Sequence, residues 1–304
     1  MQRFEVTILG TGSASPTTKR NPTAQLLNAS ERFFLIDCGE GTQVQLRKYK
    51  LSMHRIDHIF ISHLHGDHYL GLLGLLQSLH LLGRKNPINL YCFPELKEII
   101  ELQNKYSQTV LNYEIRYVFT DPKTPQLVFE DNKIEIRTFP LQHRIPCCGF
   151  LFREKVTAYR ILKEALDKYK VSTAEINKLR QGINAINEEG EEIDFKLLTR
   201  EPDPVRSYAF CSDTAFDEGI IEYIKGADLL YHESTFLKDM RDRARATFHS
   251  TAEDAAIIAK KAEVKALLLG HFSARYDDAS PFLAEAKPIF GNTFLSNEGE
   301  KFQI

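Results

Sequence analysis

One short stretch decides which fold to expect of this chain: Ser62-His63-Leu64-His65-Gly66-Asp67-His68. It directly follows Ile56–Ser62 (IDHIFIS), whose branched and aromatic residues predict a β-strand. Three histidines and an aspartate within six residues supply imidazole nitrogens and a carboxylate, the ligand types that suit zinc. The first two histidines can face one way, while a tight turn at the glycine points the aspartate and the last histidine elsewhere. One loop can therefore serve two metal ions.

This stretch cannot complete two metal sites alone, so further ligands must come from the ends of later strands. Three candidates each follow a predicted strand: His143 after Lys133–Phe139, Asp213 after Ser207–Ser212, and His271 after Ala266–Gly270. The junction of a strand and a loop is the usual position of functional residues in layered α/β folds. A carboxylate such as Asp213 can bridge two metals, and a pair roughly 3.5–4 Å apart is a clamp for phosphate-ester hydrolysis. For three other histidines, His54, His58 and His80, we expect packing or surface roles.

Composition excludes several other classes of protein. The chain has 304 residues, of which 43% are hydrophobic and 26% charged, and a chain of this length buries about 75% of its unfolded surface without covalent staples. Disordered, fibrous and disulfide-scaffold proteins are therefore excluded. No apolar stretch reaches the roughly 20 residues of a membrane span, and Glu5 stands where a signal peptide would place its apolar run. Five scattered cysteines without a CxxC pair indicate reduced thiols and a cytoplasmic location.

Short β-rich runs alternate with helical patterns along the chain, which predicts an α/β layered fold. Besides the strands already named, the expected strands are Phe4–Leu9, Arg32–Asp37, Asp228–Tyr231 and Thr293–Ser296. The expected helices are Tyr69–Leu82, Phe216–Lys225, Thr251–Lys261 and Ala279–Ile289. Thr251 and Asp254 have the spacing of a capping box, so we expect them to begin the third of these helices.

One segment, about 153–206, interrupts this alternation and looks inserted. Within it, Arg160–Tyr169 predicts an amphipathic helix, Thr173–Gln181 a second helix, and Glu188–Asp194 a loop. Residues 153–180 hold eight Lys/Arg against four Asp/Glu, whereas the whole chain has a net charge of −2. A local excess of positive charge suits contact with a nucleic-acid backbone, although charge runs are often only solvated helix faces.

At the metal stretch the sequence resembles the metallo-β-lactamase fold, whose hallmark is a His-x-His-x-Asp-His loop. That resemblance implies a four-layer αββα sandwich, two facing sheets flanked by helices, with a dinuclear zinc site at the edge between them. Over nearly its whole length the chain resembles the ribonuclease Z family, endonucleases that remove 3′ trailers from precursor tRNA. The further segments that carry this resemblance are Leu9–Pro16, Asp37–Gln43, Ser212–Thr214, His232–Thr235, His249–Thr251 and His271–Tyr276.

The resemblance also implies a function for each candidate site residue. One zinc ion would be held by His63, His65 and His143, the other by Asp67, His68 and His271, with Asp213 bridging the two. Mn²⁺ or Fe²⁺ can compete at such a site. Asp67 would also accept the proton of the attacking water, and His249 would protonate the leaving 3′ oxygen, because histidine titrates near neutral pH. Glu233 would orient His249, while Asp37 and His232 would orient ligands from behind rather than bind metal.

The same resemblance implies how RNA is bound and cut. The whole chain, 1–304, would form one metallo-β-lactamase-fold domain, and 153–206 would be an inserted, protruding arm that grips the tRNA elbow. The residues expected to contact RNA are Lys19, Arg20, Arg160, Lys163, Lys168, Lys170 and Arg275. Pro16–Asn21 resembles the family loop that senses the CCA end, and the family is usually a homodimer. Cleavage would follow the discriminator nucleotide, leaving a 3′-hydroxyl on the tRNA and a 5′-phosphate on the trailer.

Two other functions fit part of the sequence. Another hydrolase of the same fold, acting on small phosphodiesters, would explain the metal ligands but not the basic segment. A nucleic-acid-binding protein with a decayed catalytic site would have lost a ligand, yet none of the seven expected ligand positions is replaced. We therefore expect a zinc-dependent endoribonuclease of the ribonuclease Z type, with precursor tRNA as its substrate.

Overall fold

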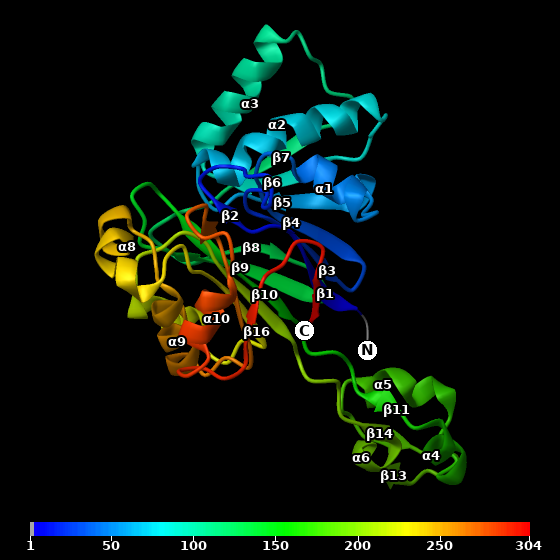
Figure 1. Ribbon diagram of the computed structural model, residues 1–304. Coiled ribbons are helices and arrows are strands. Elements are labelled where there is room, and N and C mark those ends of the chain that lie inside the picture. The colour runs from blue at the N-terminus through cyan, green and yellow to red at the C-terminus, as the bar shows by residue number, and fades with distance from the viewer. Residues whose placement is uncertain (1–2) are drawn as a thin grey trace. The chain divides into compact units, whose positions relative to one another are not determined.

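Two seven-stranded sheets pack face to face in the computed structural model, which describes residues 3–304 (Figure 1). The first sheet runs in the order β20 (Lys301–Gln303), β1 (Phe4–Gly10), β3 (Ala24–Ala29), β4 (Arg32–Cys38), β5 (Ile56–Phe60), β6 (Ile88–Cys92) and β7 (Ile115–Phe119). Neighbours from β20 to β4 pair antiparallel, whereas those from β4 to β7 pair parallel. The metal stretch therefore leaves the carboxyl end of a parallel, central strand, β5.

The second sheet supplies the strand ends that complete the site. It runs in the order β19 (Thr293–Leu295), β17 (Leu267–Gly270), β16 (Leu229–Glu233), β15 (Ser207–Cys211), β10 (Cys148–Glu154), β9 (Ile134–Pro140) and β8 (Gln126–Glu130). Strands β15, β16, β17 and β19 are parallel, so their carboxyl ends lie along one edge. The predicted strands are confirmed to within one or two residues at each end, but no prediction covered β3, β6, β7, β8, β10 or β20 of the two large sheets.

Aromatic side chains fill the space between the two sheets. The ring of Phe60 from β5 stacks on Tyr91 of β6 with ring centroids 4.1 Å apart, and its centroid lies 5.2 Å from that of Phe150 on β10 in the opposite sheet. Phe210 and Tyr231 stack in the second sheet at 4.9 Å. Such pairs contribute about 0.5–1.5 kcal/mol each beyond the burial of their area. This dry layer fixes how the two sheets, and therefore the two halves of the site, meet.

Helices cover the outer face of each sheet and complete four layers (Figure 1). The first sheet is covered by α1 (Thr42–Lys48), α2 (Gly66–Leu81) and α3 (Pro94–Tyr106). The second is covered by α7 (Ile221–Ile224), α9 (Ala252–Lys261) and α10 (Ser280–Ala286). Thr251 caps α9 and exchanges hydrogen bonds with Asp254, as the capping-box spacing predicts. The expected αββα sandwich is thus confirmed.

Helix α2 begins inside the metal stretch, three residues before the predicted start, and packs directly beneath the site. Its leucines recur at helical spacing, and Leu72, Leu75 and Leu79 are fully buried against the first sheet. At Gly71 the helix meets the turn after β4 so closely that a Cβ atom would lie 2.0 Å from the carbonyl oxygen of Gly39. Only glycine fits there, and its absence of a side chain brings the two loops of the site together.

Residues Glu154–Val205 form a separate compact unit with a small core of its own. Its elements are β11 (Arg160–Ile161), α4 (Lys163–Lys168), η2 (Thr173–Glu175), α5 (Ile176–Arg180), β12 (Ala185–Ile186), β13 (Glu192–Ile193), α6 (Phe195–Leu198) and β14 (Thr199–Arg200). The predicted helix over Arg160–Tyr169 is wrong at its start, because β11 pairs with β14 and the helix begins only at Lys163. The predicted loop Glu188–Asp194 is wrong at β13, which pairs with β12.

Two further differences concern helices. The predicted helix Phe216–Lys225 is reduced to η3 (Glu218–Ile220) and the four residues of α7, because Asp217 accepts a hydrogen bond from the backbone N–H of Gly219 and begins the first turn late. The helices α1, α3 and α8 (Arg241–Thr247) were not predicted. Within residues 3–304, every helix is too short or too polar to cross a membrane.

Candidate metal centre

The seven predicted ligands come together at the edge between the two sheets. The loop between β5 and α2 carries His63 and His65, and the first turn of α2 carries Asp67 and His68. The loops after β9, β15 and β17 carry His143, Asp213 and His271. His271 has a left-handed backbone, with φ of 60°, which is uncommon outside glycine. From this turn the His271 ring reaches Asp213 and His68 with Nε2 and the Thr235 hydroxyl with Nδ1.

One group of ligand atoms consists of three imidazole nitrogens. His65 Nδ1 lies 3.1 Å from His63 Nε2 and 3.1 Å from His143 Nε2. The Oδ2 atom of Asp213 lies 3.6 Å from His63 Nε2 and 3.9 Å from His143 Nε2. Burial lowers the pKa of all three histidines, that of His63 well below its usual value. Neutral rings present bare nitrogens, which is the state that binds a cation.

A second group lies beside the first and shares Asp213 with it. His68 Nε2 is 3.2 Å from His271 Nε2, and Asp67 Oδ2 is 3.3 Å from His271 Nε2. The other oxygen of Asp213, Oδ1, lies 3.3 Å from His68 Nε2 and 3.1 Å from His271 Nε2. Asp213 therefore turns one carboxylate oxygen toward each group, the arrangement of a bridging ligand.

The chemistry of this donor set fits bound cations. Asp213 Oδ1 is buried and has no hydrogen-bond partner among residues 3–304, although two ring nitrogens face it. Burial acts to lower the pKa of His68, but the carboxylates of Asp213, Asp67 and Asp37 raise it well above its usual value. The site thus concentrates carboxylate charge and imidazole lone pairs, and bound positive charge would stabilise it. Bound metal ions would supply that charge.

Most ligand rings are fixed by a second contact on the side away from the site. The carboxylate of Asp37 accepts a hydrogen bond from His68 Nδ1 at 2.7 Å. It also accepts hydrogen bonds from the backbone N–H and the hydroxyl of Ser62. His143 Nδ1 donates to the carbonyl of Phe248 at 2.9 Å. Asp37 thus has the position predicted for a residue that orients a ligand from behind. His232 instead donates through Nδ1 to the carbonyl oxygen of Glu233 at 2.7 Å, so this contact orients the backbone at the end of β16.

The predicted proton donor and its partner lie next to the ligands. His249 Nδ1 is 2.8 Å from Glu233 Oε1 and 3.8 Å from Asp213 Oδ2. Burial acts to lower the pKa of His249, but the charges of Glu233 and Asp213 raise it to about 9. Burial likewise opposes ionisation of Glu233, yet the positive charge of His249 lowers the pKa of that carboxyl. The pair therefore carries a proton at neutral pH.

Asp67 is ionised as well as placed among the ligands. Its burial would raise its pKa, but the charges and hydrogen bonds of His68 and His271 hold that pKa well below its usual range. The backbone N–H of Ala14 donates to Asp67 Oδ2 at 2.6 Å. Ala14, whose φ is 64°, belongs to Leu9–Pro16, one of the segments that carry the family resemblance.

A cleft of about 470 Å³ opens beside His249. Its walls include Arg243, Phe236, Ser273 and Arg275. Arg275, predicted to contact RNA, therefore borders the space next to the ligands, whereas Arg243 was not predicted because it lies in the unpredicted helix α8. Another exposed cation beside the ligands was also missed: Arg144 Nη2 lies 3.3 Å from His65 Nε2. Its adjacency to His143 in the sequence was the only signal for it.

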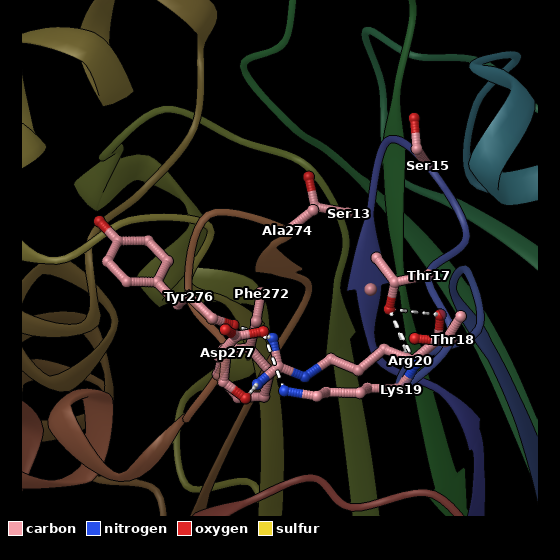
Figure 2. Close-up of a pocket in the computed structure, with 11 residues that line it drawn as sticks. Ser13, Ser15, Thr17, Thr18, Lys19, Arg20, Phe272, Ala274, Tyr276 and Asp277 are labelled. Carbon is pink, nitrogen blue, oxygen red and sulfur yellow. Dashed lines mark hydrogen bonds and ion pairs between the residues drawn. The ribbon is translucent and has the colours of Figure 1, made fainter.

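Lys19 and Arg20 are engaged within the protein (Figure 2). Lys19 Nζ forms an ion pair with Asp277 Oδ1 at 3.0 Å. Arg20 donates to the carbonyl oxygen of Tyr276 at 2.7 Å and lies over the ring of Phe272, 5.3 Å from its centroid. These contacts enclose a pocket of about 80 Å³ and fasten the 16–20 loop to the loop after β17. Both side chains are therefore engaged in holding these two loops together, and they would have to leave these contacts in order to bind RNA.

The basic residues of the unit 154–205 are only partly available to RNA. Arg160 forms an ion pair with Asp203, and Lys170 Nζ pairs with Glu189 Oε1 at 2.6 Å. Lys163 and Lys168 are exposed, and the Lys168 ammonium lies 5.2 Å from the ring centroid of Tyr169. Exposed pairs of this kind are weak and open readily, so all four cations remain candidates for phosphate contact.

Comparison with known proteins identifies the family. The profile described as Anti-Pycsar protein Apyc1 matches residues 4–174. The chain is 46% identical over 298 residues to a ribonuclease Z of Bacteroides fragilis, with 98% of each chain covered. It is 48% identical over 305 residues to a ribonuclease Z of Cytophaga hutchinsonii, covering 99% of this chain and 96% of the other.

Solved structures agree with this assignment. The human tRNase Z, short form, aligns with a TM-score of 0.70 at 28% identity and covers 98% of each chain. The metallo-β-lactamase-fold protein YhfI of Bacillus subtilis aligns over the full length of both chains with a TM-score of 0.69 at 17% identity, which shows the shared fold. The chain belongs to the ribonuclease Z family of metallo-β-lactamase-fold proteins.

Proposed function

We propose that this protein is a metal-dependent endoribonuclease that removes the 3′ trailer of precursor tRNA. It cuts after the discriminator nucleotide and leaves a 3′-hydroxyl on the tRNA and a 5′-phosphate on the trailer. The observation that carries the proposal is the juxtaposition of two ligand groups sharing Asp213 with a protonated His249–Glu233 pair. Relatives named ribonuclease Z, 41–48% identical to it over nearly the whole chain, supply the substrate class.

Two zinc ions are the cofactor we propose. His63, His65 and His143 hold one, Asp67, His68 and His271 hold the other, and Asp213 bridges them; Mn²⁺ or Fe²⁺ can take their place. Such ions, when bound, make hydroxide available at neutral pH and neutralise charge on the attacked phosphate. Asp213 is only 2% exposed, and a buried carboxylate needs a neighbouring positive charge, which supports this set.

Two side chains move protons in the proposed reaction. Asp67 is ionised and, with its Oδ2 oriented by the Ala14 N–H, accepts the proton of the attacking water. His249 enters the reaction protonated and donates to the 3′ oxygen as the P–O bond breaks. Glu233 is a positioning residue, because its carboxylate keeps the imidazole of His249 charged and fixed in orientation.

RNA binding is assigned to two regions. Arg275 borders the cleft beside His249 and is placed to contact the strand that is cut. Lys163, Lys168, Lys170 and Arg160 lie in the unit 154–205, which we propose as the tRNA-binding arm inserted into a single metallo-β-lactamase-fold domain. Sequence-independent contact with backbone phosphates through such residues should weaken steeply with salt. We also infer a homodimer in the cytoplasm; five free, buried cysteines are compatible with a reducing compartment.

The test compares two RNAs with the same 3′ trailer, one a folded precursor tRNA and the other an unstructured strand. We expect the zinc-loaded protein to cut the precursor at one bond and to leave the unstructured strand largely intact. His58→Ala, which changes a histidine outside both ligand groups, should cut equally well. If both RNAs survive while a small phosphodiester is hydrolysed, the metal centre stands and the tRNA assignment fails.

A further inference from the structure

Arg144 is an exposed cation at the metal centre that has no part in the proposed reaction. It directly follows His143, and its Nη2 atom lies 3.3 Å from His65 Nε2. Among residues 3–304, no carboxylate oxygen lies within ion-pair distance of its guanidinium. Lys19 and Arg160, by contrast, are both paired with aspartates. Arg144 is thus an arginine without a neutralising partner beside a phosphodiester-hydrolysing centre.

The contact with His65 differs from the outer contacts of the other ligand histidines. The outer nitrogens of His68 and His143 meet the carboxylate of Asp37 and a backbone carbonyl, both of which accept a hydrogen bond. The outer nitrogen of His65 meets a guanidinium, which can only donate. In the structure the neutral His65 ring can serve as the acceptor through Nε2.

That arrangement cannot persist when His65 acts as a ligand. Its Nδ1 is the atom that converges with His63 and His143, so Nδ1 must be bare to bind a cation. A neutral imidazole carries one proton, which must then sit on Nε2. Both groups across the 3.3 Å contact become donors, and a cation nearby adds repulsion. Arg144 therefore loses its acceptor when the site is loaded.

We propose that Arg144 binds a non-bridging oxygen of the RNA phosphodiester next to the metal centre. This inference rests on the proposed function, which brings a phosphate to that place. The planar fork of a guanidinium matches phosphate oxygens better than any other side chain does. Loading of the site withdraws its internal acceptor, so the availability of Arg144 to RNA is coupled to metal occupancy.

The experiment measures binding as a function of salt with a precursor tRNA whose 3′ oxygen at the cut site is replaced by a methylene group. This RNA keeps both non-bridging phosphate oxygens but is not cleaved by the zinc-loaded protein. Wild type, Arg144→Ala, Arg144→Lys and the control Arg116→Ala are each measured zinc-loaded and zinc-free, with the metal content determined. Arg116 is an exposed arginine on β7, and its Nε lies 2.8 Å from Glu114 Oε2. Replacing it removes the same charge as Arg144→Ala at a place outside the metal centre. In the zinc-loaded form, Arg144→Ala should weaken binding roughly 10- to 100-fold. The slope of log K against log salt should fall in magnitude by about 0.7–0.9.

The zinc-free form supplies the discriminating result. There, Arg144 keeps His65 as its acceptor, so wild type and Arg144→Ala should bind the RNA nearly equally. Arg144→Lys should restore the salt slope while recovering only part of the affinity, because it keeps the charge but not the fork. Arg116→Ala should match wild type in both forms.

Three results would overturn the proposal. An unchanged salt slope in zinc-loaded Arg144→Ala would mean that no phosphate is bound. An equal loss with and without zinc would mean a general electrostatic effect, and a loss of zinc from the variant would mean that Arg144 only supports His65. In each case continued cleavage of the precursor by wild type would leave the proposed function intact, whereas absence of that cleavage would refute the function itself.

Discussion

Replacing Glu233 by glutamine should move the pH dependence of catalysis in a defined direction. Glu233 is fully buried, and its Oε1 lies 2.8 Å from Nδ1 of His249, whose side chain is only 15% exposed. Its charge is a main reason that the pKa of His249 is raised to about 9. The acid form of His249 is therefore present below that pH, and the rate should fall as pH rises through it.

The size of the effect follows from the geometry. Two opposite charges about 4 Å apart at an effective dielectric constant of about 20 interact by about 4 kcal/mol, which corresponds to about 3 pKa units. Glutamine keeps a hydrogen-bonding oxygen but removes that charge, while burial and Asp213 remain. The alkaline limb of the single-turnover rate should thus shift down by about 2–3 pH units, which lowers the rate at pH 8 roughly 10- to 100-fold.

Single-turnover cleavage of precursor tRNA between pH 5 and 10 measures this shift. Glu285→Gln is the matched control, because Glu285 is a partly buried carboxylate that accepts backbone N–H groups of Lys238 and Glu253. Its pH profile should equal that of wild type. A Glu233→Gln variant whose rate falls equally at every pH, with the limb unmoved, would refute the assignment of His249 as the acid tuned by Glu233.

Three other outcomes are expected. Asp37→Ala removes the carboxylate behind a ligand ring and should weaken zinc binding about 10- to 100-fold, measured by competition with a chelating dye; unchanged affinity would contradict its orienting function. Gly71→Ala forces a Cβ against the backbone of the turn after β4 and should destabilise the fold by about 1–3 kcal/mol, measured by urea unfolding; wild-type stability would contradict the close packing. Deleting Lys155–Arg200 should abolish precursor cleavage but leave hydrolysis of a small phosphodiester intact, since β10 and β15 pair directly and a short loop can join them. Retained precursor cleavage would contradict the proposal that this segment binds tRNA.

The convergence of the seven candidate ligands was predictable because they are marked in the sequence by both type and position. Each ligand follows a strand rich in branched or aromatic residues, and such strands are visible without knowledge of the fold. Asp213 and His271 could be chosen because parallel strands deliver their carboxyl ends to one edge. Which oxygen of Asp213 faces which group depends on the packing of two sheets, and no local pattern contains that information.

The parts that escaped prediction are those decided by tertiary contact. Ala24–Ala29 (AQLLNA) has neither alternation nor β-branched residues, yet it is a buried strand because β1 and β4 pair with it on both sides. Arg20 looked like an RNA contact by its charge, but the carbonyl oxygens that occupy it lie more than 250 residues away in sequence. Arg144 was overlooked for the converse reason, because its lack of a carboxylate partner among residues 3–304 is visible only in three dimensions.

The most direct test of the central claim is the chemistry of the cut ends. A 3′-extended precursor tRNA is cleaved by the zinc-loaded protein beside Asp67→Ala, and both products are mapped to the nucleotide with their end groups determined. We predict one cut after the discriminator nucleotide, a 3′-hydroxyl on the tRNA, a 5′-phosphate on the trailer, and no product with the variant. A 2′,3′-cyclic phosphate, or full activity of Asp67→Ala, would contradict hydrolysis by water activated at this site.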